Sequence, residues 1–145
     1  MSISKRLAKY STAGLVQTAS VQLVNSTKGL QAGNVPIGGS SVPWYVVTFG
    51  AGAVSSWLAD MAHSYILPSI PVGQKVQNIA SAGTALATGA AASYGSYYAL
   101  GMLGPDFTGM NAMEVGAISE IASDYLWGNW VDPLLFGDAP SGLSY

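Results

Sequence analysis

The sequence holds few side chains that could carry out chemistry, and they fall into two small groups. His63, the only histidine, follows Asp60 by three positions, so on a helix the two side chains can form a polar pair. Glu120 and Asp124 are four positions apart, which also places both carboxylates on one helix face. No G-x-S-x-G turn is present to hold a nucleophilic serine, and one histidine is too little for a zinc site. We therefore expect no catalytic residue, no metal site and no cofactor.

The Glu120 and Asp124 pair admits two interpretations. Paired carboxylates can bind a cation or a proton, as they do in membrane relays. More commonly such a pair forms the water-facing side of an amphipathic helix. The opposite face, which includes Ile118, Ile121 and Tyr125, is then the buried or lipid-contacting one.

The composition indicates which environment the surface of the protein faces. Only 8% of the 145 residues are charged and 50% are hydrophobic, whereas an ordinary soluble domain has about 25% charged residues. The surface should therefore face lipid or a protein assembly rather than water alone. The net charge of −2 and the lack of a basic cluster give no reason to expect a nucleic acid partner.

The stretch from Val76 to Pro105 contains no charged residue. It is longer than the roughly 20 residues with which a helix crosses a bilayer, and we interpret it as a membrane span. Small residues recur along it at spacings that allow neighbouring helices to approach closely. The expected helix-packing residues are Gly83, Ala87, Gly89, Ala91 and Gly95.

The rest of the chain is organised around this stretch. Residues 1–43 are expected to form an extended N-terminal arm with a Gly/Pro linker, residues 44–136 a membrane helical domain, and residues 137–145 a tail. Within the domain, helices are expected at about 44–67, 77–104 and 112–136, and the acidic residues of the third make an amphipathic helix more plausible than a span. The predicted fold class is all-α, an integral membrane helical hairpin of two or three spans with an amphipathic C-terminal helix.

Aromatic residues lie near the ends of these elements. Trp and Tyr favour the boundary between lipid and water, so we expect interfacial anchors at Trp44, Tyr45, Tyr65, Trp127 and Trp130.

A short internal repeat links the second and fourth quarters of the chain. Gly-Ala-Val-Ser at 52–55, with Asp60 eight positions after the glycine, recurs as Gly-Ala-Ile-Ser at 116–119, with Asp124 at the same distance. The repeat predicts two similar helical arms that pack symmetrically against the small-residue helix.

The segment GAISEIASDYLWGNWVDPLL and the scarcity of charge are similar to small membrane-anchored minor capsid proteins of large icosahedral double-stranded DNA viruses. The resemblance implies a non-enzymatic structural protein of the virion internal membrane, with the lipid bilayer and other capsid or coat proteins as partners. Two alternatives remain open: a holin-like channel or permeabilising protein, and an accessory subunit of a membrane complex.

Overall fold

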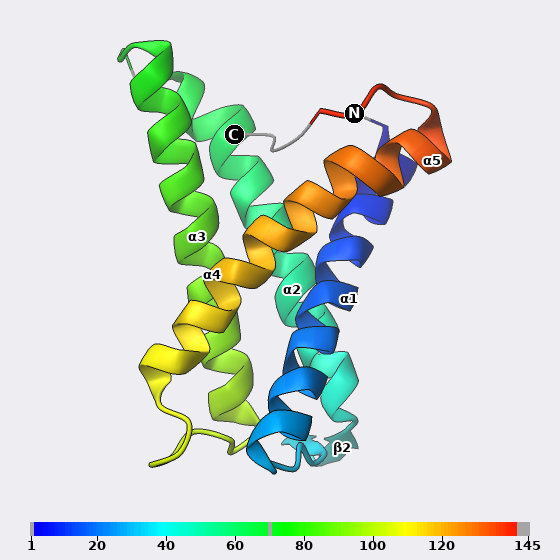
Figure 1. Cartoon of the computed structure of the whole chain (residues 1–145), viewed down its shortest axis with the longest axis vertical. Helices are drawn as coiled ribbons and strands as arrows, with labels where there is room; N and C mark the ends of the chain where they lie inside the picture. Colours follow the sequence, from blue (N-terminus) through cyan, green and yellow to red (C-terminus); the bar gives the residue numbers. More distant parts are fainter. Residues whose placement is uncertain (1, 70, 142–145) are drawn as a thin grey trace.

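Four long helices dominate the computed structural model, which describes residues 2–69 and 71–141. They are α1 (Ile3–Lys28), α2 (Trp44–Met61), α3 (Gln74–Ala99) and α4 (Gly109–Leu126). Helices account for 76% of the structure, which agrees with the all-α part of the prediction. In Figure 1, α4 runs diagonally across the other helices, and it packs most extensively on α3.

Short elements complete the fold. A π-helical turn, η1 (Ala62–Ile66), continues α2 into the 3₁₀ turn η2 (Leu67–Ser69), and a second π-helical turn, η3 (Trp127–Val131), joins α4 to α5 (Asp132–Phe136). Strands β1 (Val35–Ile37) and β2 (Ser40–Val42) form an antiparallel hairpin. Gly38 and Gly39 both have positive φ at its two-residue turn, which only glycine adopts without strain.

The N-terminal segment is helical, so the expected extended arm is wrong for residues 3–28. The Ser2 side chain caps the start of α1 by accepting a hydrogen bond from the Lys5 amide. Gly29 ends the helix in the left-handed conformation. Between these caps, α1 lies against α2 along much of its length.

The chain is built from two similar halves. Each half contains a helix of 26 residues, α1 or α3, then a helix of 18 residues, α2 or α4, then a π-helical turn. Gly52 of α2 lies directly against Ala13 and Gln17 of α1, and Gly116 of α4 lies against Gly89 and Ser93 of α3. The repeat seen in the sequence thus marks equivalent helix crossings in the two halves.

The apolar core is small and lies at one end of the bundle. It consists of Val21, Tyr97, Met102, Phe107 and Ala112. The helix interfaces elsewhere are lined by small and polar side chains. The fully or nearly buried polar residues on the long helices are Lys9, Gln17, Thr48, Ser55, Ser56, Ser81, Ser93, Ser96, Ser119, Glu120, Ser123 and Asp124.

The predicted integral membrane fold and membrane location are wrong for this structure. Among the described residues, no helix combines the length and the apolar character that crossing a bilayer requires. The reason lies in composition: α3 lacks acidic residues, but it is rich in Gly, Ser, Thr, Asn and Gln, and α2 carries two buried serines and Asp60. An uncharged segment of this kind is not an apolar one.

Candidate functional site: a polar cavity and an apolar exterior

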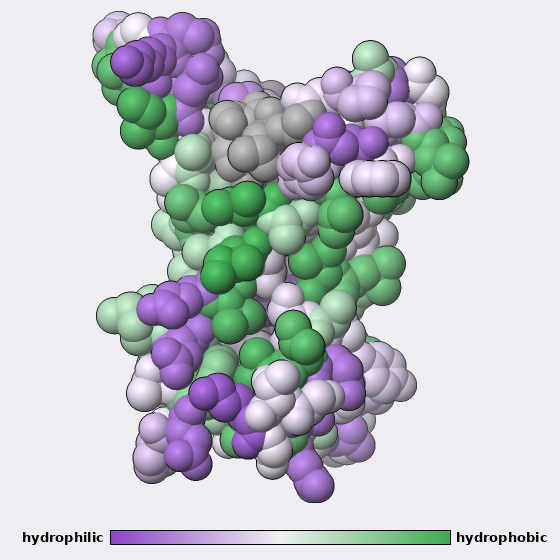
Figure 2. Space-filling model, viewed as in Figure 1, coloured by the Kyte–Doolittle hydropathy of each residue, from purple (hydrophilic) through white to green (hydrophobic). Residues whose placement is uncertain are grey.

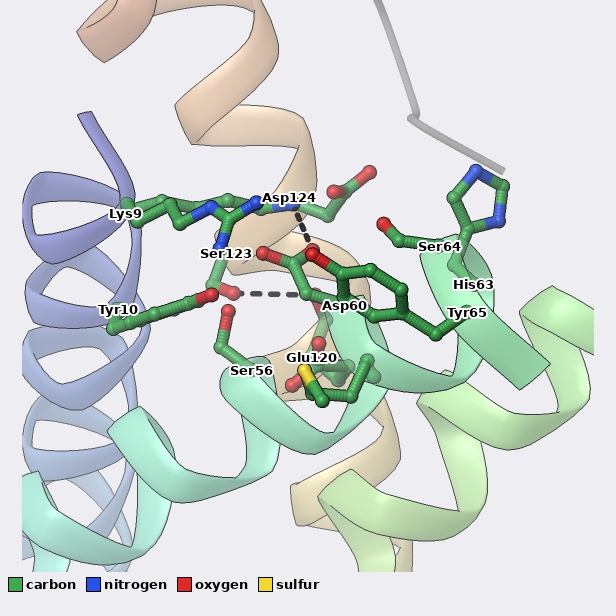
Figure 3. Close-up of a pocket in the computed structure, with 13 residues that line it drawn as sticks. Lys9, Tyr10, Ser56, Asp60, His63, Ser64, Tyr65, Glu120, Ser123 and Asp124 are labelled. Atoms are coloured by element: carbon green, nitrogen blue, oxygen red, sulfur yellow. Dashed lines mark hydrogen bonds and ion pairs between the residues drawn. The ribbon is translucent and has the colours of Figure 1, made fainter. Parts of the chain in front are cut away.

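A polar cavity of about 230 Å³ lies where α1, α2, η1 and α4 meet. Figure 3 shows its side chains converging from these four elements. The charged and phenolic residues that line it are Arg6, Lys9, Tyr10, Asp60, His63, Tyr65, Glu120 and Asp124. Lys9 is separated from the core residue Val21 by twelve positions of α1, or about 18 Å of helix, so the cavity and the apolar core are distinct.

Lys9 and Asp60 join α1 to α2 at this cavity. The Lys9 Nζ atom donates to Asp60 Oδ1 at 2.6 Å, and the Tyr10 hydroxyl also forms a hydrogen bond with Asp60. Burial and the Asp60 charge raise the pKa of Tyr10, which keeps the phenol protonated. Asp60 is therefore satisfied by two side chains of α1.

His63 forms its hydrogen bond with a different helix from the one that Asp60 bonds. Its Nδ1 atom forms a hydrogen bond with the Ser81 hydroxyl of α3. The π-helical turn explains the difference, because a π turn holds one residue more than an α turn and rotates the side chains that follow Met61. The two members of the predicted polar pair therefore have separate partners.

Glu120 is a buried carboxylate of the cavity, with 7% of its surface exposed. The Ser55 hydroxyl donates to Glu120 Oε2 at 3.2 Å. Burial raises the pKa of Glu120 to about 7, and the Ser55 hydrogen bond only partly opposes that effect. At neutral pH this carboxyl group therefore takes up and releases protons.

The face of α4 that carries Glu120 and Asp124 points inward, and the water-facing interpretation is wrong. Asp124 is 4% exposed, whereas Ile118, Ile121 and Tyr125 are exposed on the opposite face. The buried face of α4 is therefore the acidic one and not the apolar one. Serines at 119 and 123 line the inward face and let the helices approach closely enough to enclose the acids.

The mouth of the cavity carries Arg6 and Tyr65. The Arg6 guanidinium forms a hydrogen bond with the Tyr65 phenol, and Tyr65 is 58% exposed. Tyr65 belongs to the same π-helical turn as His63. Within the described residues, no group of three or more His, Asp or Glu side chains is arranged to hold a metal ion.

Only part of the predicted packing stripe on α3 lies at a helix contact. Gly83, Ala87, Ala91 and Gly95 are exposed, and a Cβ atom added at Gly83 or Gly95 would have no neighbour within 4 Å. Gly89 is buried, and a Cβ atom there would lie 2.6 Å from the Gly116 carbonyl oxygen. The contact line of α3 is the one that runs through Gly89.

The predicted interfacial anchors divide between the interior and the surface. Trp127 is 4% exposed, and Trp44 packs against the apolar core. Tyr45, Tyr65 and Trp130 are exposed.

Large apolar side chains lie mostly on the outside. Among the described residues, 28 large hydrophobic side chains are exposed. The large hydrophobic side chains that are buried are six: Val21, Val35, Tyr97, Met102, Phe107 and Trp127. In Figure 2 the hydrophobic residues cover the middle of the visible face, and hydrophilic residues gather toward its two ends. One apolar groove of about 370 Å³ lies between α1 and α2, lined by Leu15, Thr18, Tyr45, Val46, Phe49 and Gly50.

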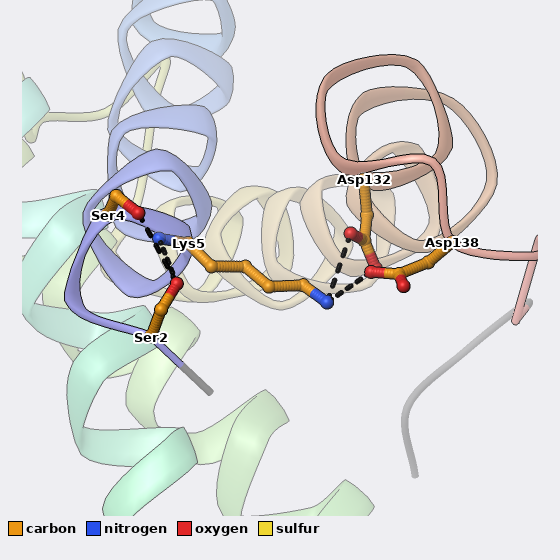
Figure 4. A network of polar contacts seen from close by, with 5 residues as sticks. All are labelled: Ser2, Ser4, Lys5, Asp132 and Asp138. Carbon is orange, nitrogen blue, oxygen red and sulfur yellow. Dashed lines mark hydrogen bonds and ion pairs between the residues drawn. The ribbon is translucent and has the colours of Figure 1, made fainter.

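A second polar contact ties the first turn of α1 to the C-terminal segment. Lys5 forms ion pairs with Asp132, at 3.3 Å, and with Asp138, as Figure 4 shows. The Lys5 ammonium lowers the pKa of Asp138. Residues 137–141 of the predicted tail are thus connected to α1, and residues 142–145 lie outside the described residues.

Sequence reasoning missed Lys9, Arg6 and Ser55. The Asp60 and Asp124 positions were found through the repeat, but nothing in the spacing of α1 indicates which of its cations faces α2. Ser55 did carry a signal, because it closes the first copy of the repeated Gly-Ala-aliphatic-Ser segment.

Comparison with protein-family models, with curated proteins and with solved structures found no match to this chain. The functional conclusions therefore depend on the geometry described above.

Proposed function

We propose that this chain is a non-enzymatic structural subunit of a larger protein assembly, held there by its exposed apolar helix faces. The observation that carries the proposal is the inverted distribution of side chains. Serine, threonine, glycine and a few paired charges fill the helix interfaces, while most large apolar side chains are on the surface.

The exposed surface is also large for the size of the chain. It measures 7969 Å², whereas a compact monomer of 14.9 kDa exposes about 7,000 Å². A stable protein interface covers about 800 Å² on each partner, so several interfaces could be accommodated. Exposed apolar residues occur along the whole α4 to α5 segment, among them Ile118, Trp130 and Leu134, and these are candidate contacts.

The low charge content supports the same function. With 8% charged residues, the chain lacks the mixed surface charge that keeps an isolated domain dispersed. The resemblance noted in the sequence favours a capsid or coat as the assembly.

Site-specific photo-cross-linking in the purified native assembly tests this proposal. A photoreactive amino acid is placed at Trp130 or Leu134, which are 66% and 85% exposed, and, as the matched control, at the exposed polar position Glu114 of α4. We expect Trp130 and Leu134 to cross-link to defined neighbouring proteins at a fixed molar ratio, and Glu114 to do so much less.

Cross-links from Trp130 and Leu134 to lipid alone, or equal and unspecific labelling from all three positions, would contradict the proposal.

A further inference from the structure

The apolar groove between α1 and α2 has a counterpart position in the second half of the chain. Gly52 lies against Gln17, and Gly116 lies against Ser93 in the same way. Matching Gly52 to Gly116 relates each position of α2 to the one 64 residues later in α4, and matching Gln17 to Ser93 relates α1 to α3 with a difference of 76. The groove can therefore be compared residue by residue with the equivalent surface of α3 and α4.

The second half carries a ridge where the first half has the groove. The counterpart of Thr18, which lines the groove, is Tyr94, and the counterpart of Tyr45 is Gly109. A Cβ atom at Gly109 would lie 2.7 Å from the Tyr94 ring, so this ring lies directly over the α4 backbone. Tyr94 and Tyr98 stack with ring centroids 6.4 Å apart, and they are 42% and 70% exposed. These two stacked rings form a tyrosine ridge on the surface.

The groove has the size and the character that suit an aromatic side chain. Its volume of about 370 Å³ is within the roughly 300–1,000 Å³ of pockets for small molecules. Among the described residues, no charged side chain lines it, and Leu15, Tyr45 and Val46 on its walls are largely exposed. A tyrosine ring that covers these side chains removes apolar surface from water, and tyrosine is among the residues that contribute most to protein interfaces.

The charges beside the ridge and the groove are opposite. Asp106 lies in the loop that follows α3, next to Phe107, whose ring packs against Tyr97, the neighbour of Tyr98 in the sequence. Lys28 ends α1, which forms one wall of the groove. Both charged side chains are exposed, and neither takes part in the ion pairs of the described residues. An acidic surface beside the ridge and a basic one beside the groove favour a contact between two copies of the chain.

We propose that the tyrosine ridge of one copy of this chain docks into the groove of a second copy. The inference rests on the proposed assembly role, and it identifies one of the neighbours in that assembly. The ridge and the groove are different surfaces, and Figure 1 shows the helices that carry them, α3 and α1, on the left and the right of the view. Each copy can therefore bind one neighbour through its ridge and another through its groove. Such heterologous contacts build rings or extended chains of subunits.

Cysteine cross-linking of the whole purified chain tests the proposal, because the chain has no cysteine of its own. Val46→Cys places a thiol in the groove, and Met110→Cys places one beside the ridge, next to Gly109. The two native side chains are 49% and 61% exposed. With a short bis-maleimide, we expect a mixture of the two folded variants to give about fivefold more cross-linked dimer than either variant alone, because a heterologous contact pairs a groove with a ridge.

Matched variants control this measurement. Ile79→Cys, at a 64% exposed position toward the other end of α3, replaces Met110→Cys and should give no more dimer with Val46→Cys than the single variants do. Tyr98→Ala in the Met110→Cys chain should lower the yield of mixed dimer about fivefold, because it removes the more exposed ring of the ridge. Tyr125→Ala, which removes an exposed tyrosine of α4 outside the ridge, should leave the yield unchanged.

Equal yields from the mixture, from either variant alone or from the Ile79→Cys control would overturn the proposal, and so would an unchanged yield with Tyr98→Ala. A photoreactive group at Val46 in the native assembly that cross-linked only to a different protein or to lipid would assign the groove to that partner and overturn it as well. None of these results changes the cross-links expected from Trp130 and Leu134, so the contact between copies can fail while the proposed assembly role holds.

Discussion

Glu120 is a carboxyl group enclosed by helices whose contacts are otherwise made by serine and glycine. The Ser55 hydroxyl donates a hydrogen bond to this carboxyl group, and burial, rather than the neighbouring Asp124, is the main reason that its pKa is raised. A buried carboxyl group of this kind is most stable when protonated.

The stability of the fold should therefore depend on pH through Glu120. The pKa of Glu120 is about 7 in the folded protein and 4.5 ordinarily. Below pH 4.5 the side chain is protonated in both the folded and the unfolded chain, so the fold is not destabilised. As pH rises from 4.5 through 7, the free energy of unfolding decreases. The shift corresponds to about 3 kcal/mol. Denaturant unfolding at pH 5 and pH 8 should show a loss in the wild type that is about 2.5 kcal/mol larger than in Glu120→Gln, since part of the effect lies below pH 5.

An identical pH dependence in Glu120→Gln and the wild type would show that Glu120 is not the group responsible. Glu114→Gln, an exposed change on the same helix, is the control and should leave the pH dependence unaltered.

Tyr97 offers a second test at the residue scale. Its side chain is fully buried in the apolar core, and its hydroxyl has no hydrogen-bond partner among the described residues. An unsatisfied buried hydroxyl costs about 1–3 kcal/mol. Tyr97→Phe should accordingly raise the free energy of unfolding by about 1 kcal/mol or more, as measured by urea denaturation.

Tyr98→Phe is the matched control, since Tyr98 is adjacent and 70% exposed. A loss of stability in Tyr97→Phe, with no change in Tyr98→Phe, would mean that the Tyr97 hydroxyl has a favourable partner.

At the scale of elements, glycine determines where the helices cross. Gly89 and Gly116 bring the backbones of α3 and α4 together, and Gly14 and Gly52 do the same for α1 and α2. Helix contacts of this kind depend on backbone proximity rather than on interlocked large side chains. They explain how 18-residue and 26-residue helices pack with so small an apolar core.

A single added methyl group should test these crossings. Gly89→Ala places a Cβ atom 2.6 Å from the Gly116 carbonyl oxygen, and overpacking of this kind costs about 1–3 kcal/mol. Gly95→Ala, in the same helix with nothing within 4 Å, should instead stabilise the fold by about 0.5–1 kcal/mol through helix propensity. Denaturant unfolding of both variants provides the measurement.

The α2 crossing gives an independent control. Gly52→Ala should destabilise the fold as Gly89→Ala does, because its Cβ atom would lie 2.6 Å from the Ala13 carbonyl oxygen. Gly50→Ala is the control in α2, since a Cβ atom at Gly50 would have nothing within 4 Å. Equal losses of stability in the crossing variant and its control, in either α2 or α3, would contradict the claim that the helix backbones are in close contact at these glycines.

The sequence predicted the positions of the helices better than their environment. The apolar and small-residue segments near 44–67, 77–104 and 112–136 correspond to α2 with η1, to α3, and to α4 with η3 and α5. The internal repeat also identified Gly52 and Gly116 as equivalent positions. Hydrophobic periodicity could not do more, because it does not distinguish an apolar face that is buried from one that a partner covers.

Two features were not predictable by local rules. The inward-facing side of α4 differs from the usual expectation, which buries Ile118 and exposes Glu120. The Glu120 face packs on α3 beside Gly89, and Ser55 of α2 bonds the carboxylate. The pairing of Lys9 with Asp60 joins residues 51 positions apart, which single-sequence reasoning cannot identify. The candidate site was therefore recognised in its acids but not in its cations.

At the scale of the whole molecule, the chain combines a polar interior with an apolar exterior. Its exposed residues include Trp130, Leu134 and Leu135 on the α4 to α5 segment and Leu15, Tyr45 and Phe49 around the groove between α1 and α2. These faces belong to different helices, so neighbouring proteins could bind on more than one side. That arrangement suits a subunit within an assembly.

The most direct measurement is the sedimentation of the native chain in gently prepared extracts of its source, with and without a mild detergent that dissolves lipid. We expect the chain to sediment, in both conditions, in a particle far larger than 14.9 kDa, together with other proteins at a fixed ratio. Sedimentation as a 14.9 kDa monomer, or loss of the large particle as soon as lipid is dissolved, would contradict the proposed role in a protein assembly.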